Sequence, residues 1–329
     1  MTTAAAYLLP IIQRLHHHIR ASVLAACEES SAAALAQVDH EGHDDTIYAI
    51  DRVSEAALIE FFERELTEPV VLIAEGLPTG ELVLPAPATA AEARWRIIID
   101  PIDGTRGLMY QKRPGWILTG VAPNLGPATG LQDIVLAVQT EIPLNKQHLS
   151  DQLWAIAGQG ARASRTNRFS GESAPLQLSP SRAATIAHGF ATVSRFFPGR
   201  RAELAALDDE LVAAALGPIQ PGKAQCFEDQ YICSAGQLYE LLAGHDRFVA
   251  DLRPLLGPEM LCSHPYDLCT ELIARELGVI VVDPWGRPLA APLNVTTNVA
   301  WVGYANPQLQ THLEPHLHSA LQNRGFVPD

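Results

Sequence analysis

The chain has 329 residues, 47% of them hydrophobic, and its 37 acidic against 23 basic residues give a formal net charge of −14. This length can bury a large core and is enough for two subdomains. The acidic balance, with no Lys/Arg-rich run, argues against a nucleic-acid-binding protein. An acidic enzyme that acts on an anionic substrate needs local cations, and metal ions are the obvious candidates.

The cysteines and the first residues of the chain bear on its compartment. Five cysteines form an odd set in a long chain, which fits a reducing compartment better than a disulfide framework. Residues 1–20 lack a secretory pattern, and no apolar run approaches the ~20 residues of a membrane span. We therefore expect a cytoplasmic protein that does not associate with membranes.

The first half of the chain has the patterns of helices followed by a mainly antiparallel sheet. Apolar spacing predicts one or two helices over Tyr7–Gln37 and another over Asp51–Leu66. The polar, turn-rich stretch Ser164–Ser181 separates this half, residues 1–175, from a second half, residues 176–329. Short apolar runs predict strands at Val70–Ala74, Ile97–Ile99, Gly115–Val121, Asp133–Gln139 and Gln152–Ala157.

The second half alternates strand and helix patterns more regularly, which indicates an α/β arrangement. Strands are expected at Ala184–Ala187, Arg247–Ala250, Val279–Val282 and Val299–Gly303. Helices are expected at Arg201–Leu216, Tyr231–Ala243, Pro265–Leu277 and Asn306–Gln322.

Two of the predicted strands end on an acid, one at Glu75 and one at Asp100. Open α/β sheets bind ligands outside the carboxyl ends of their strands, so two adjacent strands of this kind would aim both acids at one point. Pro101 predicts that the second strand stops at Asp100. Gly104-Thr105, just beyond, is typical of the opening of a helix or nest whose free N–H groups hold an anion.

The carboxylates around this turn favour a metal site. Asp100 and Asp103 are three residues apart, so they can converge on one ion together with the carbonyl of Ile102. Oxygen-only ligands select Mg²⁺ or Mn²⁺ over zinc. The alternative is a turn with a capped helix, and helix capping is likewise the alternative for Asp51 and Asp267, which open predicted helices.

The residue two positions before Asp103 argues against a covalent aspartyl-phosphate mechanism. Phosphatases of the haloacid-dehalogenase type resemble this region through a D-x-D-G-T signature whose first aspartate is the nucleophile. Here that position holds Pro101, so an aspartyl-phosphate intermediate has no residue to form on.

Taken together, these stretches resemble the inositol monophosphatase family, part of a lithium-sensitive, metal-dependent sugar-phosphatase superfamily. The D-P-[IL]-D-G-T signature of the family is matched by residues 100–105, and the resemblance extends from Asp51 to the C-terminus. A looser match covers the later W-D-x-A-A-G-x-L-I-x-x-E-A-G-G pattern through Tyr266, Asp267, Leu272, Ile273, Glu276 and Gly278. Earlier and later family positions are matched by Asp51, Glu75 and Asn306.

The resemblance implies a five-layered αβαβα sandwich of the sugar-phosphatase type, assembled as a homodimer. It implies that two or three Mg²⁺ ions, or Mn²⁺ as the alternative, are bound by Glu75, Asp100, the Ile102 carbonyl, Asp103 and Asp267. The backbone N–H groups of Gly104 and Thr105 would hold the phosphate. The Thr105 hydroxyl, with Glu75 and Asp51, would position the attacking water, and Asp251 would contact substrate hydroxyls.

Departures from the family pattern bear on the substrate. The family commonly has two consecutive acids where this chain has Glu75-Gly76, and an aromatic residue soon after D-G-T where Arg106 stands here. The R-x-x-G-S segment before the penultimate helix is replaced by residues 228–231.

We expect a Mg²⁺-dependent phosphomonoesterase that hydrolyses a small polyol or sugar phosphate by attack of a metal-activated water, with inositol monophosphate as the first candidate. Fructose-1,6-bisphosphatase and 3′-phosphoadenosine-5′-phosphate phosphatase activities remain open. The alternative of another class is a noncatalytic dimeric scaffold.

Overall fold

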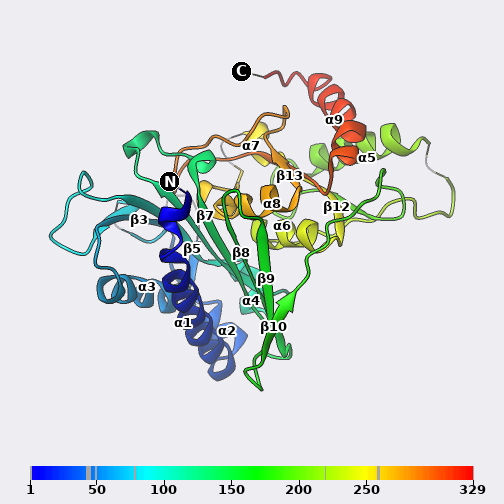
Figure 1. Cartoon of the computed structure of the whole chain (residues 1–329). Coiled ribbons are helices and arrows are strands. Elements are labelled where there is room, and N and C mark those ends of the chain that lie inside the picture. Colours follow the sequence, from blue (N-terminus) through cyan, green and yellow to red (C-terminus); the bar gives the residue numbers. More distant parts are fainter. Residues whose placement is uncertain are drawn as a thin grey trace.

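Two β-sheets of unequal size, both covered by helices, form the framework of the computed structural model (Figure 1). The structure describes residues 2–41, 46–48, 50–77, 79–218, 220–257 and 260–328, with the backbone alone for residues 2–3, 38–41, 46–47 and 51–57. A separate antiparallel pair consists of β1 (Val38–Glu41) and β2 (Thr46–Tyr48). Among the described residues, no helix has the length and apolar character needed to cross a bilayer.

The larger sheet has eight strands in the order β10-β9-β8-β7-β6-β5-β3-β4. All neighbours are antiparallel except β3 and β5, which run parallel, so the prediction of a mainly antiparallel sheet is confirmed. Its strands are β3 (Val70–Ala74), β4 (Glu81–Leu84), β5 (Trp95–Asp103), β6 (Gly115–Pro123), β7 (Leu136–Ile142), β8 (Leu149–Ile156), β9 (Ala161–Asn167) and β10 (Ser173–Leu176).

The smaller sheet has the order β11-β12-β14-β13 and belongs entirely to the second half of the chain. Its first pair is parallel and the other two pairs are antiparallel. The strands are β11 (Phe190–Val193), β12 (Asp246–Asp251), β13 (Ile280–Val282) and β14 (Trp301–Tyr304). The last strand of the large sheet, β10, ends at Leu176. The division of the chain into two domains at residues 175/176 remains a prediction.

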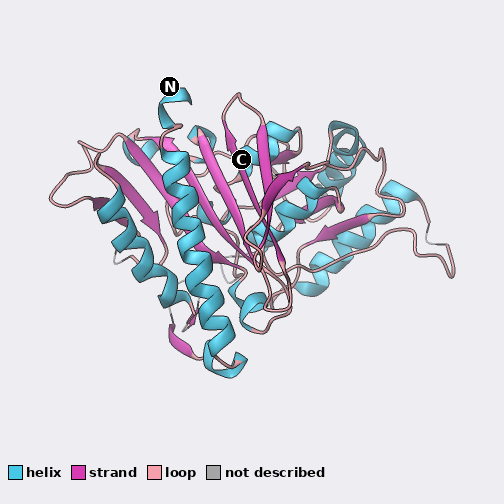
Figure 2. Ribbon diagram, turned by 60° about the horizontal axis from the view of Figure 1, so that its bottom comes forward, coloured by secondary structure: helices cyan, strands magenta, loops and turns pink. Residues whose placement is uncertain are grey.

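The helices complete five layers, which confirms the predicted αβαβα sandwich (Figures 1 and 2). One face of the large sheet is covered by α1 (Leu8–Glu29) and α3 (Asp51–Glu65). Between the sheets lie α6 (Ser234–Ala243) and α8 (Glu271–Leu277). The outer face of the small sheet is covered by α5 (Arg201–Leu216) and α9 (Pro307–Gln322).

Short helical segments fill the connections between these layers. The α-helical ones are α2 (Ala32–Leu35), α4 (Thr105–Met109) and α7 (Arg253–Leu256). The 3₁₀ segments are η1 (Thr2–Ala5), η2 (Gly126–Ala128), η3 (Leu131–Asp133) and η4 (Pro265–Leu268).

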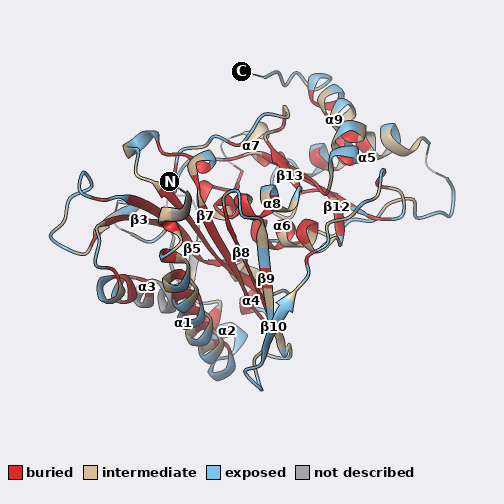
Figure 3. Ribbon diagram, viewed as in Figure 1, coloured by how far each residue is buried: buried red, intermediate tan, exposed pale blue. Residues whose placement is uncertain are grey.

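The central strands of the large sheet are buried on both faces, as Figure 3 shows in red. In β5, Ile97 and Ile99 join the core under α1 and α3, whereas Ile98 joins the core between the two sheets. Side chains alternate across a strand, so burial on both faces requires consecutive apolar residues. This is why Ile97–Ile99 reads as an unbroken run in the sequence.

The prediction that Pro101 ends its strand is wrong, because β5 continues to Asp103. Asp100 pairs with Leu118 and Asp103 pairs with Trp116, so β5 has one more residue than β6 in this interval. Such a β-bulge leaves a residue outside the ladder, where proline's missing N–H is tolerated. The bulge carries Asp103 into the same region as Asp100.

Three other element predictions are corrected by packing. Residues 184–187, expected to form a strand, lie before β11, which begins at Phe190. The Arg247 side chain donates to the carbonyls of Thr185 (3.0 Å) and Ala187 (2.5 Å), in place of the hydrogen bonds of a neighbouring strand. The helix expected over Pro265–Leu277 is divided into η4 and α8, where the Thr270 hydroxyl donates to Gln139 Oε1 (3.0 Å). The polar stretch Ser164–Ser181 contains the end of β9 and all of edge strand β10.

A buried carboxyl at the end of β7 makes stability depend on pH. Glu141 accepts hydrogen bonds from Gln147 Nε2 (2.7 Å) and from the Asp151 N–H (3.0 Å), but burial raises its pKa from 4.5 to about 7. The native state therefore holds a proton between these pH values that the unfolded state has released. The stabilisation is complete below pH 4.5 and is lost as the pH rises through about 7.

Glu141→Gln removes this ionisation. We expect the variant to gain up to about 3 kcal/mol relative to the wild type on going from pH 5 to pH 8. Urea unfolding of both proteins at the two pH values measures this difference. The exposed Glu60→Gln serves as control, and a pH-independent difference for Glu141→Gln would contradict the assignment.

Candidate active site

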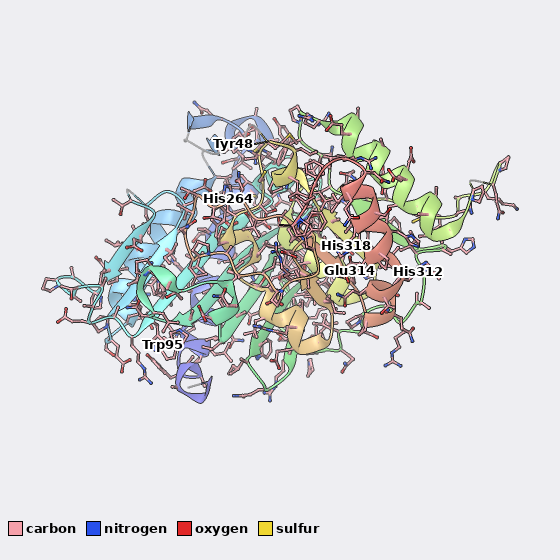
Figure 4. The ribbon with its side chains drawn as sticks, turned by 90° about the horizontal axis from the view of Figure 1, so that it is seen from above. Tyr48, Trp95, His264, His312, Glu314 and His318 are labelled. Carbon is pink, nitrogen blue, oxygen red and sulfur yellow. The ribbon has the colours of Figure 1, made fainter. Side chains whose placement is uncertain are left out.

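A cavity opens where β3 and β5 end, between the edge of the large sheet and loops of the second half. The acidic wall comes from Glu75, Asp100, Asp103 and Asp267. Tyr48 of β2 and His264, at the start of η4, also line it and are labelled in Figure 4. The remaining lining residues are Pro101, Ile102, Gly104, Thr105, Arg106, Phe196, Phe197, Ile232, Cys233, Ser234, Arg253, Leu261, Cys262, Ser263 and Tyr266.

The predicted convergence of two acid-ended strands is confirmed. β3 and β5 are parallel neighbours, and Ala74, the last residue of β3, pairs with Ile99. Glu75 and Asp100 follow these two residues directly, so both acids lie at the same end of this strand pair and line the cavity. Parallel pairing therefore brings together two acids that lie far apart in the chain.

Three carboxylates form a compact cluster in this cavity. Asp100, Asp103 and Asp267 each present a carboxylate oxygen, and these oxygens lie within 4.8 Å of one another. Burial raises the pKa of Asp100 well above its usual range, and the neighbouring carboxylates add a smaller effect in the same direction. The pKa of Asp267 is raised by the same two causes. Burial also raises the pKa of Asp103 to about 6. Like charges held this close favour either protonation or a bound cation.

Backbone N–H groups fix the orientation of each carboxylate in the cluster. The Ile102 N–H donates to Asp100 Oδ1 (3.0 Å), and the His264 N–H donates to Asp267 Oδ2 (2.6 Å). Asp267 therefore takes part in the capping box of η4, the role that the sequence offered as an alternative, and it also belongs to the cluster.

Asp103 is held from the second half of the chain. The Ala235 N–H, at the N-terminus of α6, donates to Asp103 Oδ2 (2.6 Å), and the buried Cys233 thiol is a further hydrogen-bond partner. The partial positive charge of a helix N-terminus favours an ionised carboxylate. Helix α6 thus connects the two halves at the carboxylate cluster.

The Gly104-Thr105 turn lies beside the cluster. Gly104 has φ +88°, a left-handed conformation that lets the chain turn from β5 into α4. The Thr105 hydroxyl donates to the Ile102 carbonyl (2.9 Å), which joins two of the residues singled out from the sequence.

Two of the predicted site residues, Asp51 and Asp251, are not among the described residues that line the cavity. Asp51 is the first residue of α3, and its side chain is outside the described part of the chain. Asp251 is 0% exposed and accepts bonds from Arg253 Nε (2.8 Å) and Nη2 (2.5 Å) and from the Ser263 hydroxyl (2.9 Å). Its carboxylate is thus engaged with protein groups, and Arg253 is the one of this pair that lines the cavity.

Several residues that line the cavity were not predicted from the sequence. They are Phe196, Phe197 and Arg253, together with Cys233 and Ser234 at the start of α6. None of them belongs to a motif. The available signal was that Arg253 follows Asp251 by two residues, which placed a cation beside an acid already singled out.

This five-layered α/β fold places three carboxylates that could hold a metal ion beside the Gly104-Thr105 turn. The chain belongs to the inositol monophosphatase family, since a sequence model of that family matches residues 12–323. A search of curated protein sequences gives no match.

Solved structures of similar fold cover nearly the whole chain. Fructose-1,6-bisphosphatase from Leishmania major superposes with a TM-score of 0.68 at 13% identity, covering 96% of this chain and 93% of that one. The extragenic suppressor protein suhB from Bartonella henselae gives 0.65 at 16% identity, covering 94% and 98%. An inositol monophosphatase-fructose 1,6-bisphosphatase gives 0.63 at 16% identity, covering 93% and 98%.

Proposed function

We propose that this phosphatase is a Mg²⁺-dependent phosphomonoesterase that acts on a small polyol or sugar phosphate. The observation that carries the proposal is the cluster of three carboxylates within 4.8 Å beside the Gly104-Thr105 turn. An all-oxygen donor set of this kind suits Mg²⁺, with Mn²⁺ as the alternative. Membership of the family favours this function over a noncatalytic dimeric scaffold.

The donors of the proposed metal site are Glu75, Asp100, the Ile102 carbonyl, Asp103 and Asp267. When bound, the ions supply charge neutralisation on the phosphate and a lowered pKa for the attacking water. The N–H groups of Gly104 and Thr105 bind the phosphate oxygens. The Thr105 hydroxyl, with Glu75 and Asp51, would orient the water for in-line attack.

The substrate is proposed at the level of a class. Inositol monophosphate is the first candidate, because the family model matches nearly the whole chain. Two further candidates are fructose 1,6-bisphosphate and 3′-phosphoadenosine 5′-phosphate, and the first of these appears in the names of two proteins of similar fold. A homodimer and lithium inhibition are further predictions from the family resemblance.

Phosphate release from a panel of inositol, sugar and nucleotide phosphates tests the proposal. We expect release with Mg²⁺ from at least one member of the panel, and loss of release in EDTA that added Mg²⁺ restores. Mg²⁺ at about 100 times its dissociation constant should also stabilise the fold by roughly 2.7 kcal/mol, seen as a higher melting temperature. A protein that shows neither release nor thermal stabilisation with Mg²⁺ or Mn²⁺ would overturn the proposal.

A further inference from the structure

The carboxylate cluster takes its members from segments that lie far apart in the chain. Asp100 and Asp103 belong to β5, whereas Asp267 belongs to η4. Mg²⁺ demands near-ideal octahedral geometry, so a site for it tolerates little variation in the distances between its donors. The separation of Asp103 and Asp267 therefore depends on how the second half of the chain is fastened to the large sheet.

One buried side chain, Gln139 of β7, is bonded to two segments of the second half. Its Nε2 donates to the carbonyl of Ala235 (2.9 Å), and its Oε1 accepts from the Thr270 hydroxyl (3.0 Å). A backbone carbonyl can only accept, so Ala235 determines which end of the amide faces α6. The other end then faces Thr270, and one orientation of Gln139 satisfies both bonds.

On the α6 side, Gln139 is linked to the cluster through a single residue. Ala235 accepts from Gln139 through its carbonyl, and its own N–H donates to Asp103 Oδ2 (2.6 Å). Ala235 is fully buried, at 0% exposed. A shift in the first turn of α6 would therefore move the group that orients the Asp103 carboxylate.

On the α8 side, Thr270 follows Asp267 by three residues and occupies the N-cap position of α8. A threonine hydroxyl at an N-cap ordinarily accepts from the helix backbone, but this one makes no capping bond and donates to Gln139. The same turn lies close against the sheet, since a Cβ atom on Gly120 of β6 would lie 2.7 Å from the Cys269 carbonyl oxygen. The turn after Asp267 is thus packed on β6 and hydrogen-bonded to β7.

Gln139 is a polar residue among apolar neighbours. Its partners in the adjacent strands are Leu118 and Leu153, and both belong to the core between the two sheets. Gln139 is 0% exposed, and an amide buried in this way is costly unless its polar atoms are bonded. A buried polar group with satisfied bonds selects one arrangement of the segments around it.

We propose that Gln139 is a positioning residue for the metal site. It fastens the first turn of α6 and the turn between η4 and α8 to the same strand, and thereby sets the separation of Asp103 and Asp267. This inference rests on the proposed function and adds a determinant of metal affinity to it. Groups that orient metal ligands from outside the coordination shell typically change metal affinity by 10–100-fold.

Gln139→Met tests this role, because it removes the amide and keeps a side chain of similar length. Titration calorimetry with Mg²⁺, without substrate, should give a dissociation constant about tenfold higher than that of the wild type. In the assay, the Mg²⁺ concentration for half-maximal rate should rise likewise, while kcat at saturating Mg²⁺ and the substrate KM change far less. A wild-type Mg²⁺ dissociation constant in this variant would overturn the inference.

Variants of Thr270 test the same link from its other end. Thr270→Val removes the hydroxyl and should weaken Mg²⁺ binding, whereas Thr270→Ser keeps the donor and should bind Mg²⁺ like the wild type. Gln139→Met combined with Thr270→Val should weaken binding less than the two separate effects predict, because both changes remove one shared bond. If Gln139→Met fails to fold, the two Thr270 variants decide, and equal Mg²⁺ affinities in them overturn the inference.

Thr140→Val is the matched control. Thr140 follows Gln139 on β7 and is equally buried, but its hydroxyl accepts from Gln152 Nε2 (3.0 Å) and is hydrogen-bonded to His16 Nδ1 (2.8 Å), away from the cluster. The control should lower stability in urea without changing the Mg²⁺ dissociation constant. Equal weakening of Mg²⁺ binding in Thr140→Val and Gln139→Met would show a general loss of structure and overturn the inference.

Hydrogen exchange of the Ala235 amide in EDTA separates failure of this inference from failure of the proposed function. Faster exchange in Gln139→Met than in Thr140→Val supports the link to α6 without any metal, and equal exchange overturns it. A wild type that neither binds Mg²⁺ nor releases phosphate overturns the proposed function and, with it, the role of Gln139 in metal affinity.

Discussion

Asp100→Asn should lower phosphate release by about a thousandfold, which corresponds to roughly 4 kcal/mol of lost transition-state stabilisation. Asp100 contributes one of the three carboxylate oxygens that lie within 4.8 Å of one another. An amide in its place removes a full negative charge from the proposed metal site. The measurement is kcat at saturating Mg²⁺ on the best substrate of the panel.

The same substitution should have the opposite effect on stability. Burial and the carboxylates of Asp103, Asp267 and Glu75 raise the pKa of Asp100 well above its usual range, so its ionised form is unfavourable in the metal-free protein. In EDTA at pH 8 we therefore expect Asp100→Asn to melt at a higher temperature than the wild type.

Addition of Mg²⁺ should reverse this order, because only the wild type retains the full ligand set. The control is Asp209→Asn, which changes an exposed aspartate on α5 and should alter neither quantity. Full activity of the Asp100→Asn protein would show that the carboxylate cluster does not take part in catalysis.

Gly104→Ala, which adds a single methyl group, should lower both stability and activity. Gly104 has φ +88°, and a Cβ atom there would lie 2.9 Å from Cys233 Sγ and 3.1 Å from Cys233 Cβ. Left-handed strain and this contact together should cost about 2–3 kcal/mol of stability. Relief of the contact would move the turn that carries the phosphate-binding N–H groups, so kcat should fall by about a hundredfold.

Gly158→Ala measures the effect of left-handed backbone strain without a steric contact. Gly158 has φ +75°, close to that of Gly104, but nothing lies within 4 Å of a Cβ atom built on it. It should lose about 1 kcal/mol of stability and keep its activity. Thermal unfolding and kcat measured on both variants give the comparison, and equal effects on kcat would contradict the role of the Gly104 turn.

The sequence predicted most of the fold because its signals are local. Helix α5 occupies the residues expected from the sequence, Arg201–Leu216, and α9 begins one residue after its expected start at Asn306. The unbroken apolar runs before Glu75 and Asp100 predicted two strands with acids at their ends, and parallel pairing confirms their convergence. The site roles assigned to these acids remain proposals, which the Asp100 variant addresses.

Packing overrode local preference where the site is built. Pro101 indicates the end of a strand, yet β5 passes through it in a bulge because pairing with β6 continues on both sides. The helix expected over Pro265–Leu277 divides where Thr270 reaches Gln139 of β7. The break in the second helix has no local signal, because Gln139 lies more than a hundred residues before Thr270 in the chain.

The sequence by itself determined the acid wall of the cavity, since strand ends and the motif at residues 100–105 place carboxylates at a sheet edge. Only the tertiary structure decided which other side chains line the cavity. Arg253 lies over the rings of Phe196 and Phe197, which belong to a segment far earlier in the chain. Contacts between such distant segments leave no periodic pattern in the sequence.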